Sequence, residues 1–211
     1  MIDVSSSVTT EFSDSVAIIR FNRPTERNPL SIATLDQLRA AFRTLTDRED
    51  VEAIIFTGAD DVFASGANIR ELSKLNSDSA NDFAILGQDL FQTIAQARQV
   101  TIAAINGYCM GGALDLALAC DIRVASKDAV FAHPGVYLGI ITGWGGTQRL
   151  PRLVGKARAL EILLTARRLT SQEALDIGLV TGLSDPVLDY ALEVARSCQE
   201  KGAEPKSGAR Y

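Results

Sequence analysis

One carboxylate, Asp115, lies in the middle of an almost wholly apolar segment, INGYCMGGALDLALACD (residues 105–121). The adjacent glycines Gly111 and Gly112 follow a short buried strand, and the pattern predicts a helix from about Gly112 to Ala119. Amides in the first turn of a helix have no partner inside it, and glycine leaves them uncovered. This junction can therefore hold an oxygen that becomes negative during a reaction, with Asp115 facing the same space.

Asp115 and its glycines also have a purely structural interpretation. A carboxylate in the first turn suits the helix dipole, and glycines allow a helix to pack closely on a strand. Against this, a mostly buried acid needs a partner, and such acids cluster at functional sites. The segment on its own leaves both interpretations open.

A second loop-to-helix junction lies in FASGANIREL (residues 63–72), where Ala67 follows Gly66. Two such junctions can supply two converging backbone amides. Two amides are the minimum for an oxyanion hole.

Alternating strands and helices must position these two loops. The alternation, with no linker-like break, predicts one α/β domain with parallel strands. We divide the chain into a core (1–185), a C-terminal helix (186–201) and a polar tail predicted to be disordered (202–211). Strands are expected at 16–22, 51–58, 101–105, 121–126 and 129–134. Helices are expected at 31–46, 67–75, 79–97, 112–119 and 187–201. A further helix should begin at Thr170, where Thr170 and Glu173 form a capping box.

Composition narrows the classes of function. The chain has 211 residues and a formal net charge of -5, which disfavours nucleic acid and anionic membranes as partners. The cysteines Cys109, Cys120 and Cys198 are odd in number and lack metal-ligand spacing, so we expect reduced thiols, no metal and a cytoplasmic protein. Neither a secretory signal nor a membrane span is visible.

Five segments in order resemble the enoyl-CoA hydratase/isomerase, or crotonase, superfamily from about residue 8 to about residue 200. The resemblance implies a spiral of repeated ββα units, here with the C-terminal helical part shortened, assembled as homotrimers or hexamers. It implies an acyl thioester of coenzyme A as substrate, with no separate cofactor. The segments are RFNRPTERNPLS, FTGADDVFASGANIREL, INGYCMGGALDLALACDIRVAS, LGIITGWGGTQRLPRLVG and KARALEILLTARRLTSQEALDIGLV.

The resemblance also implies roles for single residues. The amides of Ala67 and Gly112 would hold the thioester oxygen while an enolate forms. Hydratases use two carboxylates, and the first glutamate aligns with Asp115. The second glutamate of the hydratases aligns with Gly135, and the extra aspartate of dienoyl-CoA isomerases aligns with about Gly143. Because glycine has no acidic side chain, we do not transfer either two-acid mechanism to this chain.

His133, the only histidine, lies two residues before Gly135. On an extended strand the two side chains would share a face, so His133 is a candidate replacement for the missing acid. The alternative is a core or interface histidine bonded to a backbone group.

Further residues are candidates for substrate binding. Gly66, Gly111 and Gly135 belong to the loops that the resemblance places against the thioester. Four side chains are further candidates, with burial in the core or exposure on the surface as the alternative for each. They are Tyr137 and Trp144 for the acyl group and Arg27 and Arg70 for the coenzyme A channel.

These observations favour an enoyl-CoA hydratase, a lyase of fatty acid metabolism that adds or removes water at the 2,3 double bond. Because only one of the two hydratase acids is retained, isomerisation, decarboxylation and thioester hydrolysis are alternative reactions. The alternative outside the enzyme class is a non-catalytic acyl-CoA-binding or assembly subunit, which Gly135 and the short C-terminus favour.

Overall fold

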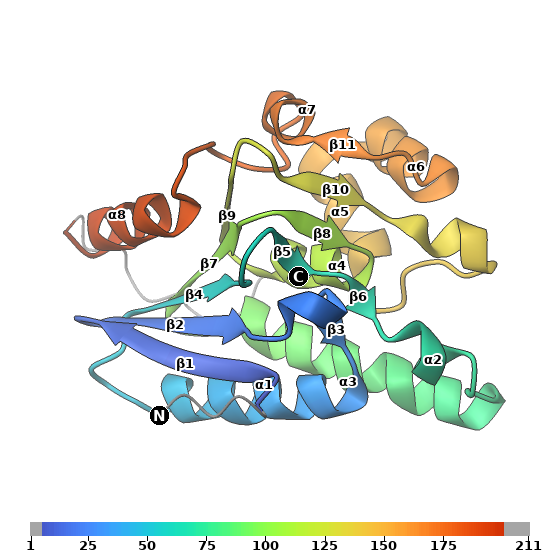
Figure 1. Ribbon diagram of the computed structural model, residues 1–211, viewed down its shortest axis with the longest axis horizontal. Helices are drawn as coiled ribbons and strands as arrows, with labels where there is room; N and C mark the ends of the chain where they lie inside the picture. The colour runs from blue at the N-terminus through green and yellow to red at the C-terminus, as the bar shows by residue number, and fades with distance from the viewer. Residues whose placement is uncertain (1–5, 201–211) are drawn as a thin grey trace.

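Runs of β-branched and aromatic residues form a five-stranded sheet in the computed structural model, which describes residues 6–200 (Figure 1). Its order is β1-β2-β4-β7-β9; β1 and β2 pair antiparallel, and the other pairs are parallel. The bounds are β1 (Val8–Ser13), β2 (Val16–Phe21), β4 (Ala53–Thr57), β7 (Val100–Ile105) and β9 (Ile122–Ala125).

In the chain, each of β4, β7 and β9 is followed by a strand that belongs to a second sheet. It contains β5 (Val62–Ala64), β8 (Tyr108–Met110), β10 (Val130–Ala132) and β11 (Leu169–Thr170), in the order β11-β10-β8-β5. A small third sheet pairs β3 (Pro29–Leu30) with β6 (Gly66–Ala67). The chain therefore repeats a strand in the first sheet, a strand in the second and then helical structure, which is the expected ββα arrangement.

The helices cover both sheets (Figure 1). Those at 146–154 and 156–165 were not predicted; in the first of them, Pro151 and the glycines around residue 145 mask the helical pattern. The bounds are η1 (Pro24–Glu26), α1 (Ile32–Thr46), α2 (Ile69–Leu72), α3 (Ser77–Ala95), α4 (Gly112–Ala119), η2 (Pro134–Leu138), α5 (Gly146–Val154), α6 (Lys156–Thr165), α7 (Ser171–Asp176) and α8 (Val187–Glu200).

Alternate residues of the first sheet point to its opposite faces and belong to two different hydrophobic cores. Ile19 and Phe21 of β2 belong to the main core, which also holds the apolar side chains of α1, α3 and α4. Val16 and Ile18 face the other side of the sheet, where α8 covers them. All eight residues of α4 are buried, so the helix that carries Asp115 lies at the centre of the molecule.

The chain leaves the extended conformation at residue 133. Strand β10 ends at Ala132, and His133 precedes the 3-10 helix η2, which contains Gly135. Pro134 has no N–H for a sheet and suits the first turn of a helix. The expectation that His133 and Gly135 share the face of one strand is therefore wrong.

The expectations for the C-terminal part of the chain stay predictions. The tail at 202–211 lies outside the described residues, and the division into a core and a C-terminal helix stays a prediction.

All three cysteines are free thiols, two of them buried. Within residues 6–200, no helix is long and apolar enough to cross a membrane.

Candidate functional site

The turn before α4 presents the first amide of that helix. Gly111 has φ 55° and ψ -122°, a conformation that only glycine adopts readily. Its N–H donates to the Ala132 carbonyl (2.9 Å), and its carbonyl accepts from the amides of Leu114 and Asp115. These bonds fix the turn, and Gly112 becomes the first helical residue, with an N–H that has no partner inside α4.

Strand β6 places a second amide beside the first. Gly66 has φ +87°, and a Cβ atom on it would lie 2.9 Å from the Gly112 nitrogen. A Cβ atom on Gly112 would in turn lie 3.5 Å from the Ala67 nitrogen. The absence of a side chain at Gly66 allows the two backbones to come this close, and the nitrogens of Ala67 and Gly112 are therefore neighbours.

Both oxygens of the Asp115 carboxylate have a partner. His133 Nε2 lies 3.0 Å from Oδ1, and the Thr142 hydroxyl donates to Oδ2. Asp115 is 1 % exposed and His133 4 % exposed. Gly146 packs so closely that any side chain there would overlap Oδ1. The acid is held in one orientation, one helical turn beyond the Gly112 amide.

The charge of Asp115 acts on its neighbours. The pKa of the Cys109 thiol is raised well above its usual value, first by burial and then by the negative charge of Asp115. Burial lowers the pKa of Arg149, and the same negative charge opposes that shift. Arg149 donates to the Trp144 carbonyl (3.2 Å) and to Gln92 (3.1 Å), so it anchors the segment that follows Thr142.

The two candidate aromatic residues have different surroundings. Trp144 is buried in the main core, next to Phe83 and Phe91, and its ring also touches Gly112. Tyr137 is 75 % exposed, and its hydroxyl donates to the Thr165 carbonyl. Trp144 thus lies against the backbone of the site, whereas Tyr137 lies on the surface of η2.

The candidate arginines are both exposed, Arg27 at the end of η1 and Arg70 on α2. Gly135 is partly buried in η2, and a Cβ atom there would lie 2.8 Å from the Ile140 carbonyl oxygen. Sequence reasoning missed Thr142 and Gly146, which contact Asp115 from 27 and 31 positions further along the chain.

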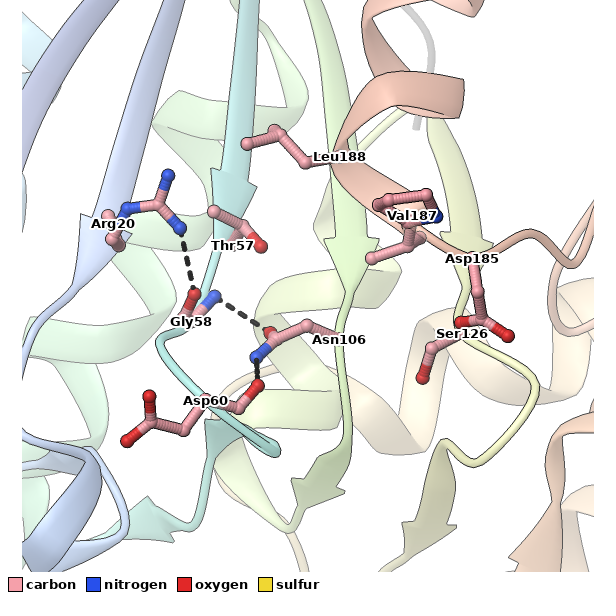
Figure 2. Close-up of a pocket in the computed structure, with 10 residues that line it drawn as sticks. Arg20, Thr57, Gly58, Asp60, Asn106, Ser126, Asp185, Val187 and Leu188 are labelled. Carbon is pink, nitrogen blue, oxygen red and sulfur yellow. Dashed lines mark hydrogen bonds between the residues drawn. The ribbon is translucent and has the colours of Figure 1, made fainter.

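Two other polar features are separate from this site. A hollow of about 270 Å³ lies at the carboxyl ends of β2 and β4, next to the start of α8 (Figure 2). Arg20 donates to the Gly58 carbonyl there, and Asn106 bonds to the amide of Gly58 and the carbonyl of Asp60. None of the candidate site residues lines it.

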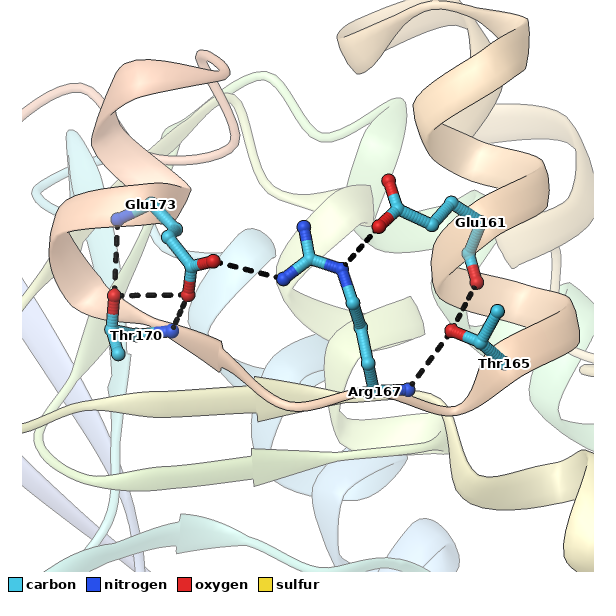
Figure 3. A network of polar contacts seen from close by, with 5 residues as sticks. All are labelled: Glu161, Thr165, Arg167, Thr170 and Glu173. Atoms are coloured by element: carbon cyan, nitrogen blue, oxygen red, sulfur yellow. Dashed lines mark hydrogen bonds and ion pairs between the residues drawn. The ribbon is translucent and has the colours of Figure 1, made fainter.

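The second polar feature is a network between α6 and α7 (Figure 3). Arg167 pairs with Glu161 at 2.6 Å and with Glu173 at 2.9 Å. Glu173 also accepts from the amide and hydroxyl of Thr170, which completes the predicted capping box. This network joins structural elements. In the part of the chain that the structure covers, no three His, Cys, Asp or Glu side chains form a group that could hold a metal ion.

Comparison with known proteins identifies the family of this chain. The family model described as "Enoyl-CoA hydratase/isomerase" matches residues 11–206. The chain is 38 % identical to the short-chain-enoyl-CoA hydratase of Clostridium acetobutylicum, over 90 % of this chain and 74 % of that protein. It is 40 % identical to the crotonyl-CoA hydratase of Syntrophomonas wolfei, over 93 % of this chain and 76 % of that protein.

A solved structure extends the agreement to the fold. The enoyl-CoA hydratase from Thermoplasma volcanium superposes with a TM-score of 0.89 at 32 % identity, covering 94 % of this chain and 80 % of the other. The α/β crotonase fold expected from the sequence is confirmed. The chain belongs to the enoyl-CoA hydratase/isomerase family.

Proposed function

We propose that this chain is an enoyl-CoA hydratase that adds or removes water at the 2,3 double bond of an acyl-CoA thioester. The observation that carries the proposal is the position of the Asp115 carboxylate, one turn beyond the adjacent amides of Ala67 and Gly112. The relatives named as hydratases, including a short-chain and a crotonyl-CoA enzyme, support the same reaction and substrate class.

In this mechanism the amides of Ala67 and Gly112 bind the thioester oxygen. As water oxygen bonds to C3, the C2–C3 π electrons move toward the carbonyl and produce an enolate, whose charge the two amides stabilise. Asp115 accepts one proton from the water. C2 then receives one proton, so the product contains the substrate plus one water molecule.

The second proton step is where this chain departs from a two-acid hydratase. Gly135 carries no side chain, so Asp115 must deliver the proton it accepted, or exchange it with His133. His133 Nε2 is 3.0 Å from Oδ1, within hydrogen-bond reach for such an exchange. We assign Asp115 as the acid/base and His133 as its proton-exchange partner.

An assay with a panel of enoyl-, dienoyl-, hydroxyacyl- and malonyl-CoA esters tests the reaction. We expect water addition to enoyl-CoA and a loss of about 10²–10⁴-fold in kcat for Asp115→Asn, which keeps the shape but not the proton-accepting group. Asp89→Asn, an exposed acid on α3, is the control with wild-type activity. Bound thioesters without any turnover would instead indicate the non-catalytic acyl-CoA binder.

One observation favours isomerisation as the second candidate. A double-bond shift moves one proton and needs one carboxylate, which is what the site provides. The same assay separates the two reactions, because hydration adds the mass of water and isomerisation leaves the mass unchanged. Release of carbon dioxide or of free coenzyme A would identify decarboxylation or hydrolysis.

We also propose that the chain acts as a homotrimer or hexamer, in the cytoplasm. The support for assembly is a large exposed apolar surface on η2, the turn after it and α6. We call it the η2–α6 face; it comprises Val136, Tyr137, Leu138, Ile140, Ile141, Leu160 and Leu164. An exposed patch of this kind marks an interaction site more often than it does free surface.

A further inference from the structure

The indole of Trp144 fills the space between α3 and α4 directly beside the Gly112 amide. Its six-membered ring lies where a Cβ atom of Gly112 would be. Its five-membered ring lies where a Cβ atom of Gly87 would be. The ring therefore spans the gap from the catalytic helix to the neighbouring helix, with backbone on both sides.

Helix α3 is shaped to receive this ring. Phe83, Gly87 and Phe91 are four residues apart and share one face of α3. The absence of a side chain at Gly87 makes a notch between the two phenylalanines, whose ring centroids lie 5.1 and 5.6 Å from that of Trp144. The indole N–H donates to the Phe83 carbonyl at 3.1 Å. The side chain is consequently held in one position.

We propose that Trp144 sets the acyl-length limit of this enzyme, so that it accepts short-chain acyl-CoA esters and excludes long ones. The inference rests on the proposed function, because it takes the thioester oxygen to lie at the Gly112 amide. An acyl chain that extends from that point between α3 and α4 meets the indole. Only an acyl group short enough to end before the ring can be bound without displacing it.

The limit on acyl length has a steric cause, the close packing around the ring, and an energetic one, the hydrogen bond that holds it. Interiors are packed closely enough that a single extra methylene group is felt, and the hydrogen bond to Phe83 opposes movement of the ring. Without the ring, each further methylene that enters the apolar gap would raise the affinity about fourfold. Truncation of Trp144 should therefore reverse the preference for short chains.

A binding and turnover series tests this inference. Butyryl-, hexanoyl- and decanoyl-CoA are titrated calorimetrically, and crotonyl-, hexenoyl- and decenoyl-CoA are used for turnover. The wild type should prefer the shortest ester of each set. Trp144→Phe, Trp144→Leu and Trp144→Ala should shift the preference stepwise to longer esters, with at least about a tenfold change in the decanoyl-to-butyryl affinity ratio for Trp144→Ala.

Phe91→Leu is the matched control, because Phe91 contacts the indole from α3, whereas the contact with Gly112 is made from α4 and does not involve Phe91. Its length profile should remain that of the wild type. An unchanged profile in Trp144→Phe and Trp144→Leu, both folded by circular dichroism, would overturn the inference while the proposed function stands. Failure of the wild type to bind any of these thioesters would overturn the proposed function itself.

Discussion

At the scale of single residues, Thr142 holds the orientation of the proposed acid. Its hydroxyl donates to Asp115 Oδ2, while His133 contacts the other oxygen. Thr142→Val keeps the shape and removes this donor, so the carboxylate loses a charge-assisted hydrogen bond of about 1.5–3 kcal/mol. We expect kcat for hydration to fall about tenfold or more with little change in KM, and Thr142→Ser to restore it. Steady-state kinetics on crotonyl-CoA would measure both, and wild-type kcat in Thr142→Val would contradict the role.

The contact between His133 and Asp115 gives a second prediction at this scale. His133→Gln can still donate to Oδ1, but glutamine does not exchange protons near neutral pH. We expect a loss of about 10²-fold in kcat with an unchanged melting temperature. Full activity in His133→Gln, together with low activity in His133→Ala, would reduce His133 to a residue that only orients the acid.

How far these residues were predictable depends on their separation in the sequence. Gly111, Gly112 and Asp115 lie within one turn, so local rules for helix ends indicated the site. Thr142 contacts Asp115 from 27 positions away, and nothing local in its sequence marks it. The argument for His133 assumed that it shares a strand with Gly135, which is wrong. Its contact with Asp115 is made from the position just before the turn that Pro134 begins.

At the scale of elements, Arg123 fixes the end of α4. Its guanidinium donates to the carbonyls of Cys120 (2.7 Å) and Leu179 (3.0 Å), and the residue as a whole is 7 % exposed. Arg123→Met would remove these buried, charge-assisted hydrogen bonds and lower the free energy of unfolding by about 3 kcal/mol. Arg123→Lys should not restore it, because an ammonium cannot reproduce the planar set of donors. Urea denaturation measures both, and a loss below about 0.5 kcal/mol would contradict the role.

The cap of α7 gives a pH-dependent prediction. The pKa of Glu173 lies below its usual 4.5 because the Thr170 amide and then Arg167 donate to its carboxylate. A lowered pKa in the folded state means that the stabilisation is present above the unfolded value and is lost as the pH falls through the folded value. Glu173→Gln should therefore melt below the wild type near neutral pH, with the difference vanishing in acid. A difference that stays constant with pH would contradict this, and high salt should reduce it.

The prediction of elements succeeded where the pattern was strong and local. The capping box at Thr170 and Glu173 has the expected geometry. Helix α5 was missed because Pro151 and the glycines before it are usual helix-breaking signals, although the turn at Gly145 and the packing of Leu150 and Val154 stabilise the helix. Tertiary packing thus overrides propensity in the segment that also supplies Thr142 and Trp144.

At the scale of the whole molecule, the two sheets explain why the site is central. Each turn of the spiral passes from the first sheet to the second, and the turns around Gly66 and Gly111 follow β5 and β8, which are neighbours in that second sheet. Adjacent strands bring the two amides together although they lie 45 residues apart, from Ala67 to Gly112. The sequence indicates both loops separately, and the parallel pairing of β5 with β8 makes them one site.

The η2–α6 face gives the last prediction, at the level of assembly. Ile141 and Leu164 are each 58 % exposed, so a charge at either position costs little in a monomer but is strongly unfavourable in an apolar interface. We expect the wild type to be a trimer or hexamer by light scattering, and Ile141→Glu and Leu164→Glu to dissociate with unchanged circular dichroism. Phe12→Glu, at a 51 % exposed residue of β1, is the control that should stay assembled, because β1 and α6 lie on opposite sides of the molecule (Figure 1). A monomeric wild type, or variants that remain assembled, would contradict the assignment of this face.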